Sequence, residues 1–214
     1  NQSSDAIRAS FVSAAASDGA VEKRAGDFTA AFAAAAKKLE AVYETPFAVH
    51  APMEPMNCVA HVKSDSCEIW APTQAPQGAV REAASILGLP EEKITVHVTL
   101  SGGGFGRRLW NDYVGDAVRV SKAAGAPVQV MWTRADDMKH SSYRPSTYNL
   151  LKGGLDKNGR LTAWMHRLVG PSSKGIVAGY AVPSYDIPHL LIDTHILETG
   201  VPIGPWRSVG ASQN

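Results

Sequence analysis

The chain has 214 residues and a formal net charge of +1, with 21 Lys and Arg against 20 Asp and Glu. This length can bury a hydrophobic core without cross-links, and 44% hydrophobic with 19% charged residues excludes disordered, collagen-like and coiled-coil chains. The balanced charge excludes a protein that binds nucleic acid by neutralising many phosphates, and no run approaches the roughly 18 apolar residues of a membrane span. We therefore expect no nucleic-acid partner and no direct membrane insertion.

The first predicted element is a helix that begins after Asp27, a favourable N-cap residue. Its apolar stripe has the 3.6-residue period and consists of Phe28, Phe32, Ala35 and Leu39. We expect residues 1–38 to be an N-terminal helical segment and residues 39–214 to be a separate domain. An extended stretch follows over 39–47, and prolines then predict an irregular segment.

A β-hairpin is predicted next, with strands at 59–62 and 67–70 around a polar turn. Such a hairpin would bring Cys58 and Cys67 near each other, so a disulfide is one possibility and two free thiols the other. Two cysteines are too few for a four-thiolate zinc site or a disulfide framework.

The centre of the chain predicts a helix, a strand, a glycine-rich loop and a second helix in succession. Pro76 suits the first turn of the first helix, which ends at Gly88. Residues 94–100 alternate as a strand, and the second helix ends at Gly125.

The remainder predicts a strand at 128–132, a hairpin of strands 148–155 and 161–169 around Asn158-Gly159, and a strand at 190–197. The combination of strand–helix units with an antiparallel hairpin predicts an α+β fold with mixed sheets and packed helices.

The most informative loop contains Gly102, Gly103, Gly104, Phe105 and Gly106, followed by Arg107 and Arg108. Glycines between a strand and a helix let backbone N–H groups approach an anion, and guanidinium groups suit phosphate. The loop fits neither the dinucleotide-binding nor the P-loop pattern. A phosphate-bearing cofactor is therefore one interpretation, and a tight structural turn with solvated arginines is the other.

Four motifs occur in a characteristic order: HAPMEPMNC at 50–58, WAPTQAPQ at 70–77, GGGFGRR at 102–108 and GPWRS at 204–208. This combination resembles the large, molybdenum-binding subunit of the xanthine oxidase family of molybdenum hydroxylases. The double arginine and the first motif resemble most closely the branch of isoquinoline 1-oxidoreductase beta-subunits and membrane-associated aldehyde dehydrogenases.

The resemblance implies roles for particular residues. Gln74 matches the glutamine that reaches toward the molybdenum centre, and Arg207 matches the arginine that steadies substrate or transition-state charge, so both are candidate catalytic residues. The candidate cofactor-binding residues are Gln74, Gly103, Gly104, Phe105, Gly106, Arg107 and Arg108. No protein ligand to a metal is expected.

Two further positions bear on the chemistry that the resemblance implies. Leu109 stands where purine-oxidising members have a substrate-binding glutamate, which argues against xanthine as the substrate. Glu54 is a tempting general base, but the family's catalytic glutamate lies beyond Asn214, so Glu54 is interpreted as a structural residue. We therefore expect this chain to be a fragment that is inactive alone.

The implied activity is hydroxylation of N-heteroaromatics or oxidation of aldehydes, with water as the oxygen source. The implied cofactor is molybdopterin cytosine dinucleotide with molybdenum. The implied partners are a small-molecule substrate, a small subunit with [2Fe-2S] clusters that removes electrons, and a cytochrome c subunit as a further possibility. The implied location is the periplasm, with the cytoplasm as the alternative.

The alternative function is a non-catalytic module. Such a module would use the Gly-Arg loop to bind an anion or a partner and would hold no molybdenum.

Overall fold

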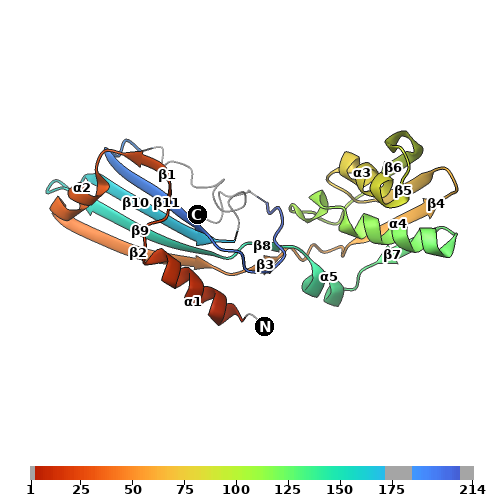
Figure 1. Cartoon of the computed structure of the whole chain (residues 1–214), viewed down its shortest axis with the longest axis horizontal. Coiled ribbons are helices and arrows are strands. Elements are labelled where there is room, and N and C mark those ends of the chain that lie inside the picture. Colours follow the sequence, from red (N-terminus) through yellow and green to blue (C-terminus); the bar gives the residue numbers. More distant parts are fainter. Residues whose placement is uncertain (1–2, 172–184, 208–214) are drawn as a thin grey trace. The chain divides into compact units, whose positions relative to one another are not determined.

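The computed structural model describes residues 3–171 and 185–207, and the chain divides into two compact units. Among the described residues, unit 1 comprises those of Asn1–Ala48 and Pro145–Val201, and unit 2 comprises Val49–Arg144 and Pro202–Arg207. Figure 1 shows helices beside a sheet in each unit. The predicted α+β class with mixed sheets and packed helices is confirmed.

Unit 1 is built on a five-stranded sheet in the order β1-β11-β10-β9-β2. β10 and β11 are parallel, and the other neighbours are antiparallel. Both helices contact β9 and β10. The elements are α1 (Ser4–Ala15), β1 (Ala20–Ala25), α2 (Phe28–Ala34), β2 (Lys37–Thr45), β9 (Thr147–Leu155), β10 (Leu161–Gly170) and β11 (His189–Ile196).

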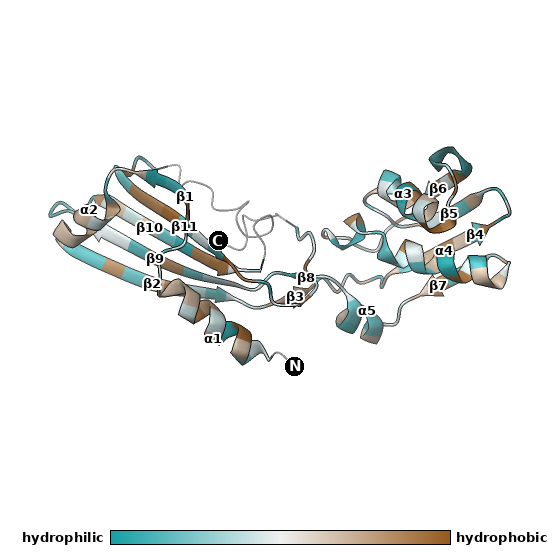
Figure 2. Cartoon of the chain, in the orientation of Figure 1, coloured by the Kyte–Doolittle hydropathy of each residue, from teal (hydrophilic) through white to brown (hydrophobic). Residues whose placement is uncertain are grey.

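Helix α1 begins at a side-chain cap, because Ser3 Oγ accepts a hydrogen bond from the backbone N–H of Ala6. Its buried residues Ile7, Phe11 and Ala15 recur every four positions and pack against Val169 of β10. Figure 2 shows the hydrophobic run along β11, which supplies Leu190 and Ile192 to a second apolar cluster.

The predicted helix from Asp27 to Leu39 is wrong in its second half. Asp27 caps α2 as expected, with Oδ1 accepting from Ala30 N at 3.0 Å, but the helix ends at Ala34. β2 begins at Lys37 and pairs antiparallel with β9, so Leu39 lies opposite Gly153 in the sheet. Pairing with a distant strand overrides the local apolar period, and the expected division at residue 38 falls inside β2.

Unit 2 has a four-stranded sheet in the order β6-β5-β4-β7, in which β5 and β6 are parallel and the other neighbours antiparallel. A two-stranded sheet joins β3 (Ala48–Val49) and β8 (Tyr143–Arg144). The other elements are β4 (Asn57–Val62), β5 (Cys67–Ala71), α3 (Pro76–Leu87), β6 (Ile94–Val98), α4 (Asp112–Ala124), β7 (Val128–Met131) and α5 (Arg134–His140), with 3-10 turns at Glu91–Lys93 and Arg107–Leu109.

The core of unit 2 lies between its sheet and helices α3 and α4. Both helices end as predicted, with Gly88 and Gly125 in left-handed conformations at φ of 70° and 63°. Within the described ranges, no helix is both long and apolar enough to cross a membrane.

The predicted hairpin of β4 and β5 forms, but its register separates the two cysteines. Cys67 lies opposite Val62, at the turn end of β4, whereas Cys58 lies near the other end of that strand. Both thiols are free and buried, and burial raises the pKa of Cys58 to about 12 and that of Cys67 to about 11. The disulfide alternative is therefore wrong.

Unit 1 also holds buried polar groups on β10. Arg167 forms a two-pronged ion pair with the buried carboxylate of Asp193 at 2.8 and 2.7 Å, and it also donates to Ala15 O at the end of α1. The neighbouring His166 lies 3.0 Å from Asn149 Oδ1, and burial lowers its pKa to about 4.

The buried imidazole of His166 predicts a pH dependence of stability. The folded state holds His166 neutral down to about pH 4, whereas the unfolded chain binds its proton near pH 6.5. Stability is therefore full above pH 6.5 and falls by about 3 kcal/mol as the pH drops toward 4. Urea unfolding of the protein and of His166→Gln across this range should show a shallower decline in the variant. Equal slopes would contradict the assignment.

Candidate functional site

The chain brings all four sequence motifs together in unit 2. The parallel pairing of β5 and β6 places their carboxyl ends at the same edge of the sheet. Gln74 follows β5, and the glycine loop follows β6. The segment before β4 and the segment at 204–207 both hydrogen-bond to this loop, whereas Ser208, the last residue of the fourth motif, lies outside the described residues.

Gln74 lies directly on the glycine loop. Its Oε1 accepts a hydrogen bond from Gly106 N at 3.1 Å, and its backbone N–H donates to Arg108 O at 3.0 Å. A Cβ atom at Gly104 would lie 2.4 Å from Gln74 Oε1, so this approach requires glycine. The Gln74 side chain is exposed, and its amide nitrogen has no acceptor among residues 3–171 and 185–207.

The loop itself has an unusual backbone. Phe105 has a φ of 54°, in the left-handed region that non-glycine residues rarely adopt, and its ring is 42% exposed. In the part of the chain that the structure describes, no acceptor is present for the backbone N–H groups of Gly103, Gly104 and Phe105. Three successive free donors of this kind suit an anion or an oxygen-rich ligand.

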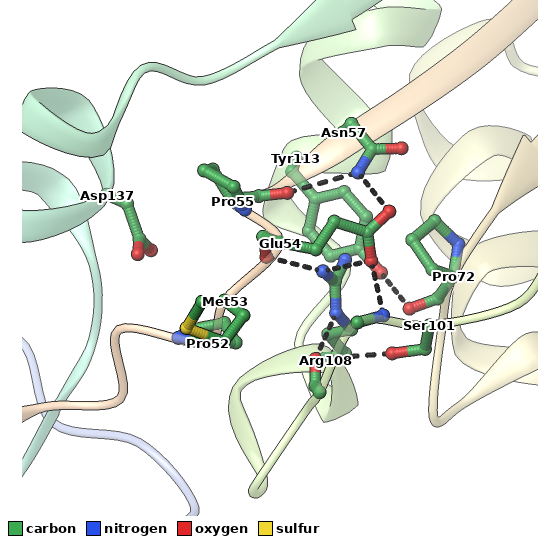
Figure 3. A network of polar contacts seen from close by, with 12 residues as sticks. Pro52, Met53, Glu54, Pro55, Asn57, Pro72, Ser101, Arg108, Tyr113 and Asp137 are labelled. Carbon is green, nitrogen blue, oxygen red and sulfur yellow. Dashed lines mark hydrogen bonds and ion pairs between the residues drawn. The ribbon is translucent and has the colours of Figure 1, made fainter.

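The two arginines are buried and bind protein acceptors, although Nη1 of Arg108 has no hydrogen-bond partner among the described residues. Arg107 forms a two-pronged ion pair with Asp112 at 2.8 and 2.7 Å, donates to Ser141 Oγ at 2.7 Å, and lies over the Trp132 ring. Arg108 donates to Gly103 O and to Glu54 (Figure 3). The alternative of solvated arginines is therefore wrong, and both charges are neutralised within the protein.

The segment before Arg207 runs beside the loop. Arg207 N donates to Phe105 O at 2.8 Å, and the Arg207 side chain is exposed. Pro205 O lies 2.7 Å from His50 Nε2, and the rings of His50 and Trp206 are 4.5 Å apart. Burial lowers the pKa of His50, so this imidazole is neutral at pH 7.

The acidic pair after β7 has a structural role. Asp136 and Asp137 lie in the first turn of helix α5. Asp136 completes a capping box with Thr133, and Asp137 accepts a hydrogen bond from Arg134 at 2.6 Å. Asp136 therefore caps the helix and Asp137 pairs through Oδ2, while the buried Oδ1 of Asp137 has no hydrogen-bond partner among the described residues.

Sequence reasoning missed the side chains that accept hydrogen bonds from Arg107. Asp112 and Ser141 carry no motif, and Ser141 is 34 residues from Arg107 in the chain. The sequence gives a weak indication for Asp112 alone, because an acidic residue in the first turn of a helix interacts favourably with the helix dipole.

The profile of the family described as molybdopterin cofactor-binding domain matches residues 12–214. The chain belongs to this family. It is 33% identical to isoquinoline 1-oxidoreductase subunit beta of Brevundimonas diminuta over 76% of this chain and 23% of that protein. It is 34% identical to the aldehyde oxidoreductase molybdenum-binding subunit PaoC of Escherichia coli O157:H7 over 68% of this chain and 20% of that one.

Among solved structures, quinoline 2-oxidoreductase from Pseudomonas putida 86 has the same fold, with a TM-score of 0.78 and 24% identity over 91% of this chain and 27% of that chain. Aldehyde oxidoreductase from Desulfovibrio gigas aligns with a TM-score of 0.75 and 20% identity, over 92% of this chain and 23% of that chain. The resemblance to the xanthine oxidase family is confirmed. The chain spans between a fifth and a quarter of the length of these two curated relatives.

The close approach of Gln74 to Gly104 yields a prediction. In Gly104→Ala, the new Cβ displaces the Gln74 side chain and breaks its hydrogen bond from Gly106 N, so hydrogen exchange of the Gly106 amide should rise about tenfold. Gly153→Ala is the matched control, because its Cβ would meet only ordinary contacts of 3.5 Å or more. Unchanged Gly106 exchange in Gly104→Ala would disprove the contact.

Proposed function

We propose that this chain is part of the molybdenum-binding subunit of an oxidoreductase that hydroxylates N-heteroaromatics or oxidises aldehydes, with water as the oxygen source. The observation that carries the proposal is the convergence of Gln74, the free N–H groups of the glycine loop and the 204–207 segment in unit 2. The family membership and the names of the relatives support the same activity.

The residues present fit a molybdopterin cofactor. The Gln74 amide nitrogen and the N–H groups of Gly103, Gly104 and Phe105 are donors that an oxygen-rich ligand could accept from, and Gly104 and Gly106 add no side chain that would obstruct it. When bound, the molybdenum centre would accept the electrons of the oxidation. Gln74 and the loop would bind and orient the cofactor, while Arg107 and Arg108 would act through the loop's shape.

Three exposed side chains in or directly after the loop are apolar. Phe105, Leu109 and Trp110 are each between 42% and 48% exposed. Leu109 offers no carboxylate to a purine, which supports an aldehyde or a weakly polar heteroaromatic ring as the substrate. Arg207, in the fourth motif, is exposed and has no carboxylate partner among the described residues. We assign it to the stabilisation of substrate or transition-state charge.

The finer assignments follow from the same proposal. The cofactor is taken to be the cytosine dinucleotide form of molybdopterin, and electrons are taken to leave through [2Fe-2S] clusters on a small partner subunit, with a cytochrome c subunit as a further acceptor. A periplasmic location is proposed by analogy with the resembled branch. The similarity to a subunit of isoquinoline 1-oxidoreductase supports assembly with partner subunits.

The alternative of a non-catalytic module lacks support. That function used the Gly-Arg loop to bind an anion or a partner, but the guanidinium groups of this loop bind Asp112, Ser141 and Glu54 within the protein. The family membership also supports the molybdopterin-binding interpretation over this alternative.

The proposal predicts that Gln74→Ala and Phe105→Ala, made in the complete enzyme, lower turnover by about a hundredfold while the fold persists, because each removes a preorganised contact at the cofactor. Gln77→Ala is the control, since Gln77 is an exposed glutamine that bonds only to Glu91. Turnover is measured with an aldehyde, an N-heteroaromatic and an artificial electron acceptor, with molybdenum determined by elemental mass spectrometry.

Near-normal turnover in both variants would remove the site assignment. Metal-free wild-type protein, purified from a host that loads another molybdenum hydroxylase, would remove the proposed function itself.

A further inference from the structure

Glu54 joins the proline-rich segment before β4 to the glycine loop. Its Oε2 accepts hydrogen bonds from Gly102 N at 2.8 Å and Arg108 Nη2 at 2.9 Å, and its Oε1 accepts from Asn57 Nδ2 at 2.9 Å. The Glu54 backbone N–H donates back to Gly102 O at 3.3 Å. A Cβ atom at Gly102 would lie 2.4 Å from Glu54 Cβ, so the two backbones are in close contact.

Arg108 connects the same carboxylate to the rest of the loop. Its side chain is fully buried; Nε donates to Gly103 O at 2.7 Å and Nη2 donates to Glu54 O at 2.8 Å (Figure 3). The backbone carbonyl of Arg108 accepts from Gln74 N. One residue therefore contacts the proline-rich segment, the glycine loop and the Gln74 segment.

This pair is not arranged for general-base catalysis. Both carboxylate oxygens of Glu54 accept hydrogen bonds from protein donors, and its side chain is 33% exposed. A buried arginine with one charged partner adds little net stability, because desolvation offsets the attraction. The ion pair instead restricts the conformation of the chain. The segment it restricts most is the glycine loop, because glycine loses more conformational entropy on ordering than any other residue.

We propose that Glu54 and Arg108 are positioning residues that hold the Gly102–Gly106 loop and Gln74 in the geometry that receives the molybdopterin cofactor. This inference rests on the proposed function. It differs from the family's cofactor contacts, because neither side chain touches the cofactor in this role. Removal of either partner releases the loop, so the free N–H groups of Gly103, Gly104 and Phe105 lose their common orientation.

The experiment uses the complete enzyme and three substitutions. Glu54→Gln keeps the size of the side chain and removes its charge, and Arg108→Met keeps the length and removes the donors. Glu68→Gln is the matched control, because Glu68 lies in β5 and forms an exposed ion pair with Lys63 in the hairpin turn, with no hydrogen bond to the glycine loop among the described residues. Two quantities are measured: hydrogen exchange over residues 101–110 in cofactor-free protein, and molybdenum and released pterin per protein chain.

We expect exchange over 101–110 to rise about tenfold in Glu54→Gln and Arg108→Met, including at the Gly106 amide, which contacts neither substituted side chain. Molybdenum and pterin content should fall together in both variants and stay at the wild-type level in Glu68→Gln. The double variant should lose no more than the worse single variant, because the two residues act through one interaction.

Wild-type exchange in both variants would overturn the inference, and so would faster exchange with full cofactor content. Loss of folded protein in Arg108→Met leaves Glu54→Gln to decide the question. A wild-type enzyme without molybdopterin would refute the proposed function and with it the cofactor part of this inference, whereas the exchange measurement on cofactor-free protein would still decide whether the pair holds the loop.

Discussion

A buried arginine needs a neutralising charge, and Arg108 obtains it from Glu54. Its Nε donates to Gly103 O, while its buried Nη1 has no hydrogen-bond partner among the described residues. The requirement draws together segments that are 54 residues apart in the chain. Gln74 is linked to the same residues, because its backbone N–H donates to the carbonyl oxygen of Arg108. The arrangement of the candidate site therefore depends on the ion pair between Arg108 and Glu54.

Close packing of backbone against side chain sets the second constraint. Glu54 and Gln74 approach the glycine loop so closely that a Cβ at Gly102 or Gly104 would lie 2.4 Å from them. These glycines are needed for contacts within the protein, and the free N–H groups between them are a consequence of the same geometry. Phe105, held at a positive φ, receives Arg207 N on its carbonyl and keeps its ring exposed.

The two arginines suit phosphate binding by residue type, but they bind carboxylates of the protein. A double arginine after a glycine loop suggests phosphate binding, because the guanidinium geometry matches phosphate as well as carboxylate. In this chain the carboxylates of Asp112 and Glu54 occupy that geometry. Under the proposed function, the donors that would face the cofactor are the backbone N–H groups of the loop and the Gln74 amide.

The sequence by itself determined the features that depend on neighbouring residues: the glycine-terminated helices α3 and α4, the Asn158-Gly159 hairpin, the hairpin of β4 and β5, and the family carried by four motifs in order. Each follows from local backbone preferences or from a pattern of several residues. Only the tertiary structure decided where α2 stops, because β9 pairs with Leu39. It also decided the separation of Cys58 from Cys67 and the partners of Arg107 and Arg108, because strand register and long-range ion pairs join residues whose spacing in the chain carries no period.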